Sequence, residues 1–299
     1  MLTVALPRGK SLEQRTLELF RQARITVRRE GDSIDFPGTA ELSEGSFIKP
    51  KRIPLLVAEG DFDIGITGED VILESGAHVE VCARLNYSRS TDEHTRGVLF
   101  TSDKEDVRSV RDIPRGSVVF SEYPNLTRQF FLRHDLPVEV VFSPGSAEAE
   151  VPRKYRFGVA LSETGRSLRE NSLRVLDVIF ESRTVLLANP QCLRNPAKRE
   201  AVKVLQLILQ GVEEARGKAF LSMNVPKGAI AAVLDHLPAL ASPTIAPLAP
   251  SQASGEAQSS ISSVVPVTEI NVLIPKLLKM GAKGIITMPI SSVIQSWQD

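Results

Sequence analysis

Short apolar runs alternate with amphipathic helical patterns along most of this chain, and that alternation limits the possible folds more than any other feature. Short runs rich in Val, Ile and Leu predict strands, while several of the segments between them place apolar residues at helical spacing. Strands that alternate with helices build α/β units on a largely parallel sheet. At roughly 100–200 residues per domain, the 299-residue length predicts two or three domains.

The predicted elements fall into two consecutive sets, which indicate two lobes. Strands of the first set are predicted over 2–6, 62–66, 79–82 and 97–100, with helices through 12–23 and 55–59. Strands of the second set are predicted over 117–120, 138–142, 157–161 and 175–180, with a helix over 125–133. A strand over 185–188 is then expected to return to the first lobe, and a long amphipathic helix follows over 201–215.

A third, smaller region begins near Lys218. It reads strand, helix, strand, helix, strand over 220–225, 230–236, 261–267, 270–280 and 284–288, with a loop rich in Ser, Ala, Gly and Pro over 247–260. This order resembles half of a split βαβ sandwich, a common small regulatory module. We therefore expect lobe I at 1–98 and 184–217, lobe II at 99–183, and a C-terminal domain at 218–299.

Charge and composition exclude several classes of function. The 36 Lys and Arg balance the 36 Asp and Glu, which argues against a broad basic face for nucleic acid. Cys82 and Cys192 are far apart, so neither a disulfide framework nor a zinc knuckle is expected. The four histidines show no metal-binding spacing. With no signal-peptide core and no apolar run of about 20 residues, we expect a cytoplasmic protein without a membrane span.

The strongest local motif follows the predicted strand over 157–161 and opens a helix. It consists of Glu163, Thr164, Gly165, Arg166, Ser167 and Leu168. Amide groups at a helix N-terminus attract anions, Gly165 permits close approach of a phosphate, and Arg166 adds positive charge. The alternative is an ordinary helix cap, because Ser, Thr and Gly are common before helices.

Two further groups of residues suit an anionic ligand. Gly65, Thr67 and Gly68 surround a predicted strand-to-helix turn, which either lines a ligand cleft or only gives the helix room to pack. Two cations and a glycine follow the first strand, at Arg8, Gly9 and Lys10, and two more cations lie in a separate loop, at Lys49 and Lys51. Such cations suit a polyanion in a cleft, although each alone also fits a solvated surface charge.

Five stretches, in the right order, resemble the long form of the ATP phosphoribosyltransferase family. The stretches are Ala5–Gly9, Asp63–Gly68, Tyr123–Thr127, Glu163–Asn171 and Ser242–Ile245 with the region that follows it. The resemblance implies a two-lobed, periplasmic-binding-protein-like α/β core with a small ferredoxin-like C-terminal regulatory domain. Together these stretches run nearly from end to end of the chain.

The resemblance also implies a reaction. N1 of ATP attacks C1 of phosphoribosyl pyrophosphate, pyrophosphate carrying Mg²⁺ leaves, and phosphoribosyl-ATP forms as the first step of histidine biosynthesis. On this interpretation residues 163–168 hold the 5′-phosphate of phosphoribosyl pyrophosphate. The pyrophosphate and ATP side is assigned to Arg8, Gly9, Lys10, Lys49, Lys51, Gly65, Thr67 and Gly68.

Regulation and assembly follow from the same resemblance. The C-terminal domain is expected to bind histidine as a feedback inhibitor, with Ser242, Pro243 and Thr244 offering hydroxyls and a backbone edge to the amino acid. A homo-oligomer, from dimer to hexamer, is expected. No catalytic side chain is assigned, because positioning and charge neutralisation dominate this chemistry.

One departure from the family pattern stands in the strand before the phosphate loop. Family members usually carry two acidic residues there that contact the ribose hydroxyls, whereas this chain has Arg156 and Ala160. Glu150 or Glu163 could substitute. The departure keeps open an alternative function, a non-catalytic or weakened nucleotide-binding sensor or regulatory subunit built on the same two lobes.

Overall fold

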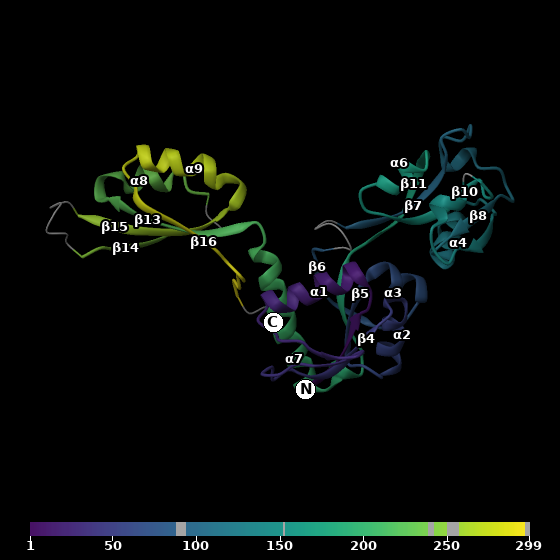
Figure 1. Cartoon of the computed structure of the whole chain (residues 1–299), viewed down its shortest axis with the longest axis horizontal. Coiled ribbons are helices and arrows are strands. Elements are labelled where there is room, and N and C mark those ends of the chain that lie inside the picture. Colours follow the sequence, from purple (N-terminus) through teal and green to yellow (C-terminus); the bar gives the residue numbers. More distant parts are fainter. Residues whose placement is uncertain (88–93, 152, 239–241, 250–256, 297–299) are drawn as a thin grey trace. The chain divides into compact units, whose positions relative to one another are not determined.

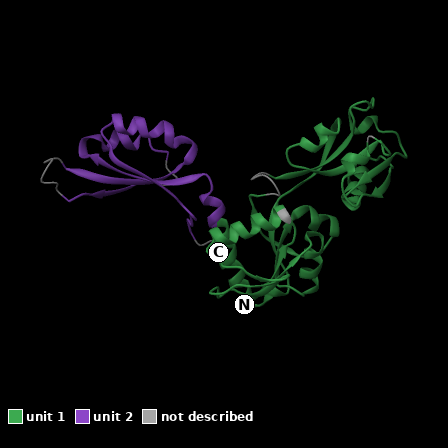
Figure 2. Cartoon of the chain, in the orientation of Figure 1, with its two compact units in different colours: residues 1–210 green, residues 211–299 purple. Residues whose placement is uncertain are grey.

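The computed structural model describes residues 1–87, 94–151, 153–238, 242–249 and 257–296 (Figure 1). The chain divides into two compact units, residues 1–210 and 211–299 (Figure 2). The first unit holds two β-sheets and the second holds one. Within the described ranges, no helix is both long enough and apolar enough to cross a membrane.

The first sheet has seven strands in the order β2-β3-β4-β1-β5-β12-β6. They are β1 (Leu2–Pro7), β2 (Arg28–Glu30), β3 (Ser33–Asp35), β4 (Leu42–Ile48), β5 (Ile64–Gly68), β6 (Glu80–Leu85) and β12 (Thr184–Ala188). β1 runs parallel to β4 and β5, and β12 runs antiparallel to β5 and β6. The prediction that the strand over 185–188 returns to this sheet is confirmed.

Each central parallel strand of the first sheet leads into a helix. β1 is followed by α1 (Lys10–Gln22), β4 by a 3-10 turn (Pro50–Arg52) and α2 (Ile53–Glu59), and β5 by α3 (Glu69–Ser75). β1 and β12 are almost wholly buried, as expected for central strands covered on both faces. We call this sheet with α1, α2 and α3 the first subdomain.

The second sheet has five strands in the order β11-β7-β10-β8-β9. They are β7 (Thr95–Ser102), β8 (Val118–Ser121), β9 (Glu139–Phe142), β10 (Phe157–Ser162) and β11 (Leu173–Ser182). Its helices are α4 (Pro124–Arg133), α5 (Ala147–Glu150) and α6 (Arg166–Glu170), with a 3-10 turn over Val110–Asp112. This sheet with α4, α5 and α6 is the second subdomain.

β7 shows where the sequence pattern was insufficient. It contains the strand predicted over 97–100 within the first set, yet it pairs with β10 and β11 in the second sheet. An apolar run identifies a buried strand but not its pairing partner. After β12, a 3-10 turn (Cys192–Arg194) leads into α7 (Pro196–Ala215), which confirms the predicted long helix.

The second unit is a four-stranded antiparallel sheet in the order β14-β15-β13-β16. Its elements are β13 (Lys218–Pro226), a 3-10 turn (Lys227–Ala229), α8 (Ile230–Leu234), β14 (Thr244–Pro247), β15 (Gln258–Pro266), α9 (Val267–Lys279) and β16 (Lys283–Pro289). The succession βαββαβ confirms the predicted ferredoxin-like module. Both helices lie over one face of the sheet (Figure 1), where Leu221, Val225 and Leu277 are fully buried.

Candidate functional site

Most of the cations and glycines predicted in the first subdomain lie at one edge of its sheet. β1, β4 and β5 are parallel and end together, with Pro7 paired to Ile48 and the amide of Arg8 donating a 2.7 Å hydrogen bond to the Ile48 carbonyl. Four of the predicted residues lie at or just beyond these carboxyl ends, namely Arg8, Gly9, Lys49 and Gly68. In α/β sheets ligands bind outside this edge.

The cations of this edge differ in their partners. The Arg8 guanidinium donates a 2.7 Å hydrogen bond to Asp32, and Lys49 is exposed. Lys51 Nζ lies 5.8 Å from the ring centroid of Tyr123 and 5.6 Å from that of Phe142, both in the second subdomain. The backbone of Lys10 begins α1, while its side chain lies outside the described part of the structure.

Gly9 takes a backbone conformation that favours glycine. Gly9 is the N-cap of α1 and has a φ of +132°. Its amide donates a 2.9 Å hydrogen bond to Glu13 Oε2. That backbone hydrogen bond and the nearby Arg29 guanidinium outweigh burial and hold the pKa of Glu13 below its usual value. The Glu13 carboxylate therefore already accepts the hydrogen bond of the Gly9 amide, at a position that the family resemblance assigns to the pyrophosphate and ATP side.

The Gly65–Gly68 segment serves packing at two of its positions. A Cβ on Gly65 would lie 2.5 Å from Ile53 Cγ2, so this glycine lets α2 approach the sheet. Thr67 is fully buried, and its hydroxyl donates to the Pro50 carbonyl at 3.2 Å. A Cβ on Gly68 would meet the carboxylate of Asp70. Gly68, which is partly exposed, lines a cavity of about 30 Å³.

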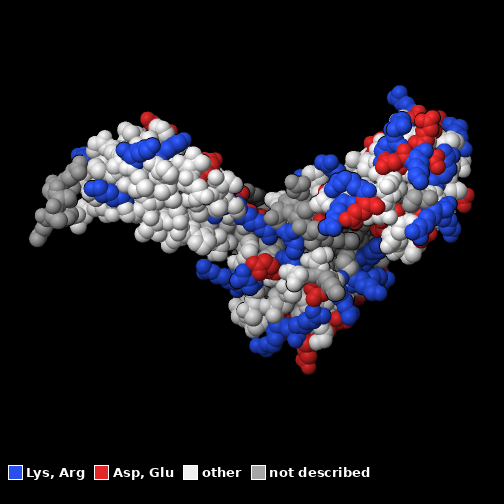
Figure 3. Space-filling view, turned by 45° about the horizontal axis from the view of Figure 1, so that its top comes forward, with Lys and Arg blue, Asp and Glu red and all other residues white. Residues whose placement is uncertain are grey.

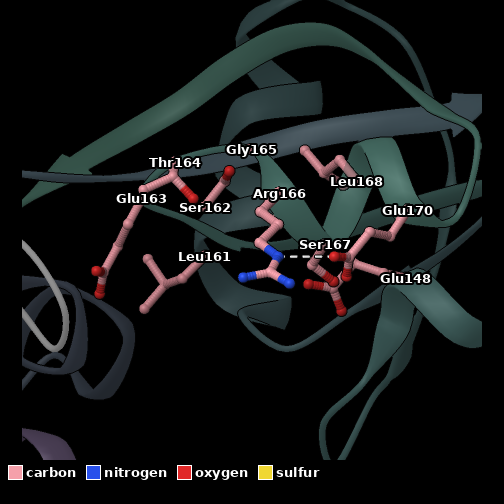
Figure 4. Close-up of a pocket in the computed structure, with 10 residues that line it drawn as sticks. All are labelled: Glu148, Leu161, Ser162, Glu163, Thr164, Gly165, Arg166, Ser167, Leu168 and Glu170. Carbon is pink, nitrogen blue, oxygen red and sulfur yellow. Dashed lines mark hydrogen bonds and ion pairs between the residues drawn. The ribbon is translucent and has the colours of Figure 1, made fainter.

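The predicted phosphate loop lines another cavity, of about 320 Å³ (Figure 4). Gly165 is the N-cap of α6 with a φ of +68°, in the left-handed region that favours glycine. The Arg169 guanidinium donates a 2.9 Å hydrogen bond to the Thr164 carbonyl and so holds the first residues of the loop in place. The structure brings all six predicted loop residues together, and they line this cavity with Glu148, Leu161, Ser162 and Glu170.

Two carboxylates that the sequence did not single out line the same cavity. Glu170 accepts a 2.7 Å hydrogen bond from Arg166, and Glu148 is brought to the loop by α5 (Figure 4). With Glu163, the lining carries three carboxylates and one cation. The available signal was the helical spacing of Arg166 and Glu170. Glu148 precedes the loop by a whole strand, so only the fold shows its place.

At the two positions that depart from the family pattern, Arg156 and Ala160 make other interactions. The Arg156 guanidinium forms an ion pair with Glu105 at 2.7 Å. Ala160 is 2% exposed within an apolar cluster that includes Val98, Phe100 and Leu168. Neither position therefore offers a carboxylate to a ligand, and the apolar surroundings of Ala160 would not favour one.

The candidate histidine-binding residues lie in the second unit. Ser242 is exposed, Pro243 is half-buried, and Thr244 is exposed at the start of β14, opposite Ser262 of β15. The sequence predicted a turn here and no strand before the loop over 247–260. β14 is a short edge strand ending in Pro247, and short exposed strands with proline carry little hydrophobic pattern.

In the described portions of the chain, no group of three or more His, Cys, Asp or Glu side chains is arranged to hold a metal ion. Both cysteines are free thiols. Burial raises the pKa of Cys82 to about 11 and that of Cys192 to about 12, so neither is an activated nucleophile.

Comparison with known proteins identifies relatives along nearly the whole chain. Residues 49–211 match the family model described as ATP phosphoribosyltransferase, and residues 215–292 match that described as HisG, C-terminal domain. The chain is 36% identical to the ATP phosphoribosyltransferase of Chlorobaculum parvum over 98% of both chains. It is 34% identical to that of Koribacter versatilis over 98% of this chain and 99% of the relative.

A solved structure resembles the larger part of the chain. It is described as the ATP phosphoribosyl transferase (HisG:HisZ) complex from Thermotoga maritima. The match has a TM-score of 0.60 and 27% sequence identity, and it covers 72% of this chain and 99% of that chain.

Proposed function

Because the chain belongs to the ATP phosphoribosyltransferase family, pentosyltransferases of histidine biosynthesis, we propose that its phosphate loop anchors phosphoribosyl pyrophosphate for transfer to N1 of ATP. The observation that carries this assignment is the cavity lined by residues 163–168, which joins a left-handed glycine, two hydroxyl side chains and an arginine. These groups suit the 5′-phosphate, which the hydroxyls and the loop amides can bind through hydrogen bonds.

Glu148 supplies the carboxylate for the ribose hydroxyls. It lines the loop cavity, and the two positions of the usual acidic pair hold Arg156 and Ala160. Glu170 already accepts a hydrogen bond from Arg166. A carboxylate can accept hydrogen bonds from two neighbouring hydroxyls at once. The family's ribose contact is therefore moved from the strand to α5.

The edge formed by the ends of β1, β4 and β5 receives the polyphosphate groups. Arg8, Lys49 and Lys51 provide its positive charge, and Gly68 lies at the same carboxyl ends, where it is the last residue of β5. Mg²⁺ enters with the pyrophosphate group as part of the substrate, where it would offset negative charge as pyrophosphate leaves. The described residues build no resident metal site, and the protein's own part is to bind and orient the phosphates.

Catalysis then rests on electrostatics rather than on a covalent intermediate. As the bond from C1 to pyrophosphate breaks, negative charge grows on the leaving group and positive charge on the ribose ring. Arg8, Lys49 and Lys51 stabilise the first, and Glu148 stabilises the second. The cysteine thiols, with raised pKa values, take no part.

The test is product formation by the purified full-length chain. Mass spectrometry should detect phosphoribosyl-ATP, with pyrophosphate in equal amount, when ATP, phosphoribosyl pyrophosphate and Mg²⁺ are all present. Omitting either substrate should abolish both products. Binding of both substrates without any product would instead support a non-catalytic nucleotide sensor, which the names of the relatives do not favour.

The second unit senses histidine and inhibits the reaction. Ser242 and Thr244 place exposed hydroxyls beside the open edge of β14, where an amino acid's charged ends could bind. Inhibition at a distance requires histidine to bind two states of the enzyme unequally. Calorimetry should detect histidine binding to the intact chain and its loss in Ser242→Ala/Thr244→Val. No heat and no inhibition at millimolar histidine would refute this regulation.

The second unit also supports a homo-oligomer, from dimer to hexamer. It carries 6 of the 36 Lys and Arg and 6 of the 36 Asp and Glu, so its surface is mostly uncharged (Figure 3). Ile286 and Met288 are 56% and 46% exposed on β16, an edge strand. Exposed apolar side chains of this kind suit contact with another copy. The proposed substrates support a cytoplasmic location, and the balanced charge argues against a nucleic-acid partner.

A further inference from the structure

A buried polar network joins the two subdomains of the first unit. Tyr123 lies just before α4, and its hydroxyl donates a 2.8 Å hydrogen bond to Asp70 Oδ2 of α3. The hydroxyl of Ser182, the last residue of β11, donates a 2.6 Å hydrogen bond to Asp70 Oδ1. The same hydroxyl accepts a 3.0 Å hydrogen bond from the Asp70 amide. Tyr123, Asp70 and Ser182 are 2%, 4% and 1% exposed. A buried carboxylate with this many donors is held in one place.

The surrounding backbone is shaped around this carboxylate. A Cβ on Gly68 would lie 2.1 Å from Asp70 Oδ1 and 3.5 Å from Ser182 Oγ, so no larger residue fits while Asp70 keeps this position. The Glu69 amide donates a 2.8 Å hydrogen bond to the Arg183 carbonyl. Arg183 joins β11 of the second sheet to β12 of the first. The network therefore lies where the chain crosses from one subdomain to the other.

A second contact lies beside the first. The Glu74 carboxylate of α3 accepts hydrogen bonds of 2.9 Å and 3.0 Å from the amides of Asn125 and Leu126. These amides belong to the first turn of α4, where backbone donors lack partners within the helix and where negative charge is favoured. One face of α3 thus holds both Tyr123 and the start of α4.

The network also lies next to both candidate binding regions. Asp70 and Ser182 line the small cavity that includes Gly68 and Leu161, and Leu161 also lines the phosphate-loop cavity. The Tyr123 ring, whose hydroxyl binds Asp70, lies 5.8 Å from Lys51 Nζ. The Tyr123 side chain thus binds the buried carboxylate through its hydroxyl and lies within cation–π range of a cation of the polyphosphate edge.

We propose that the Tyr123–Asp70 hydrogen bond is a positioning latch that sets the polyphosphate edge of the first subdomain against the phosphate loop of the second. Both side chains are buried and hydrogen-bonded to each other, so the role assigned to them is to position the subdomains and not to react. Removing the latch leaves each binding region intact but lets the two subdomains separate more readily. The link to catalysis rests on the proposed function, whereas the latch itself rests on the contacts of Tyr123, Asp70 and Glu74.

Tyr123→Phe tests the latch because it removes the hydroxyl and keeps the ring. Tyr87→Phe is the matched control, since the Tyr87 hydroxyl is also buried but contacts Thr16 within the first subdomain, at 2.9 Å. Loss of a hydrogen bond to a buried carboxylate should favour opening by about tenfold. Hydrogen exchange at the Asn125 and Leu126 amides should therefore become about tenfold faster in Tyr123→Phe and stay unchanged in Tyr87→Phe.

Kinetics supply the readout that a purely structural role would not move. In Tyr123→Phe, kcat/KM of the two-substrate reaction should fall about tenfold, while calorimetry should give a Kd for phosphoribosyl pyrophosphate alone within about twofold of wild type. Asp70→Asn should have a similar effect, and the double variant should be no worse than the poorer single variant.

The outcomes separate the latch from the proposed function. Unchanged exchange at Asn125 and Leu126 in Tyr123→Phe would overturn the latch, whatever the activity. Faster exchange with unchanged kcat/KM would overturn its positioning role. Faster exchange in a protein whose wild type fails to bind phosphoribosyl pyrophosphate would leave the latch standing and overturn the proposed function.

Discussion

The Arg166 guanidinium donates a 2.7 Å hydrogen bond to the Glu170 carboxylate across one turn of α6, so the single cation of the phosphate loop is paired. The Arg166 and Glu170 side chains are 80% and 58% exposed, and an exposed pair of this kind adds little to stability. Its importance lies in the charge that the loop offers to a phosphate.

Glu170→Gln should therefore strengthen binding of phosphoribosyl pyrophosphate. The substitution releases Arg166 and removes a negative charge, and we expect a Kd about three- to tenfold lower at low ionic strength, an effect that salt weakens. Glu200→Gln, the same change at an exposed position of α7, is the control. Equal Kd values for Glu170→Gln and wild type would show that Arg166 does not contact the substrate.

Glu148→Gln should weaken binding of the sugar and slow its transfer. An amide of the same shape keeps one acceptor but loses the charge that favours both ribose hydroxyls and the cationic transition state. We expect kcat/KM for phosphoribosyl pyrophosphate to fall about 10- to 100-fold, measured by initial rates. If kcat/KM stays at the wild-type value, the ribose carboxylate must be sought elsewhere.

Ala160→Asp should destabilise the chain rather than restore a ribose contact. Ala160 is 2% exposed among apolar side chains, and a carboxylate buried there would lack a partner. We expect the free energy of unfolding to fall by about 2–4 kcal/mol in urea denaturation. A folded Ala160→Asp variant with tighter sugar binding would contradict the assignment of that role to Glu148.

The Lys198–Asp63 ion pair should make stability depend on acid pH. Burial opposes ionisation of Asp63, but hydrogen bonds from Lys198 and the Thr3 amide outweigh it and lower its pKa. Because folding lowers the pKa of Asp63, its ionised carboxylate stabilises the fold at pH values above the unfolded pKa of about 3.9. This stabilisation is lost as pH falls through the folded pKa. Lys198→Met should therefore cost about 1–2 kcal/mol at pH 7 and less below about pH 4.

That difference is measured by urea denaturation of wild type and Lys198→Met across the acid range. Lys203→Met, a similar change one to two turns along α7, is a control for the loss of a cation. A stability difference between Lys198→Met and wild type that stayed constant with pH would show that the Asp63 carboxylate gains nothing from the ion pair.

Much of the fold was predictable because local patterns determine it. Apolar runs identified the buried strands, and the return of residues 185–188 to the first sheet followed from the two-lobed pattern. β7 was harder, because its run of apolar residues does not show which sheet it joins. β14 was missed, because four exposed residues at a sheet edge bury too little surface to show an apolar pattern.

The candidate site was predictable only where its residues are contiguous. The loop over 163–168 is one segment, so its glycine, hydroxyls and arginine were visible together. Glu148 reaches the same cavity from α5, and Tyr123 meets Asp70 from the other subdomain. For Gly65 the residue pattern left both a ligand cleft and packing open, and the family resemblance assigned it to the ligand side. Its neighbours in the structure favour packing, which sequence spacing alone does not distinguish.

The most direct test of the central claim is calorimetric titration of phosphoribosyl pyrophosphate into wild type and Ser167→Asp. Ser167 lies in the first turn of α6 and lines the loop cavity, so a carboxylate there should repel the 5′-phosphate. The account predicts saturable binding to wild type and a Kd raised at least 100-fold in a folded Ser167→Asp variant. Equal affinities for the two proteins would contradict it.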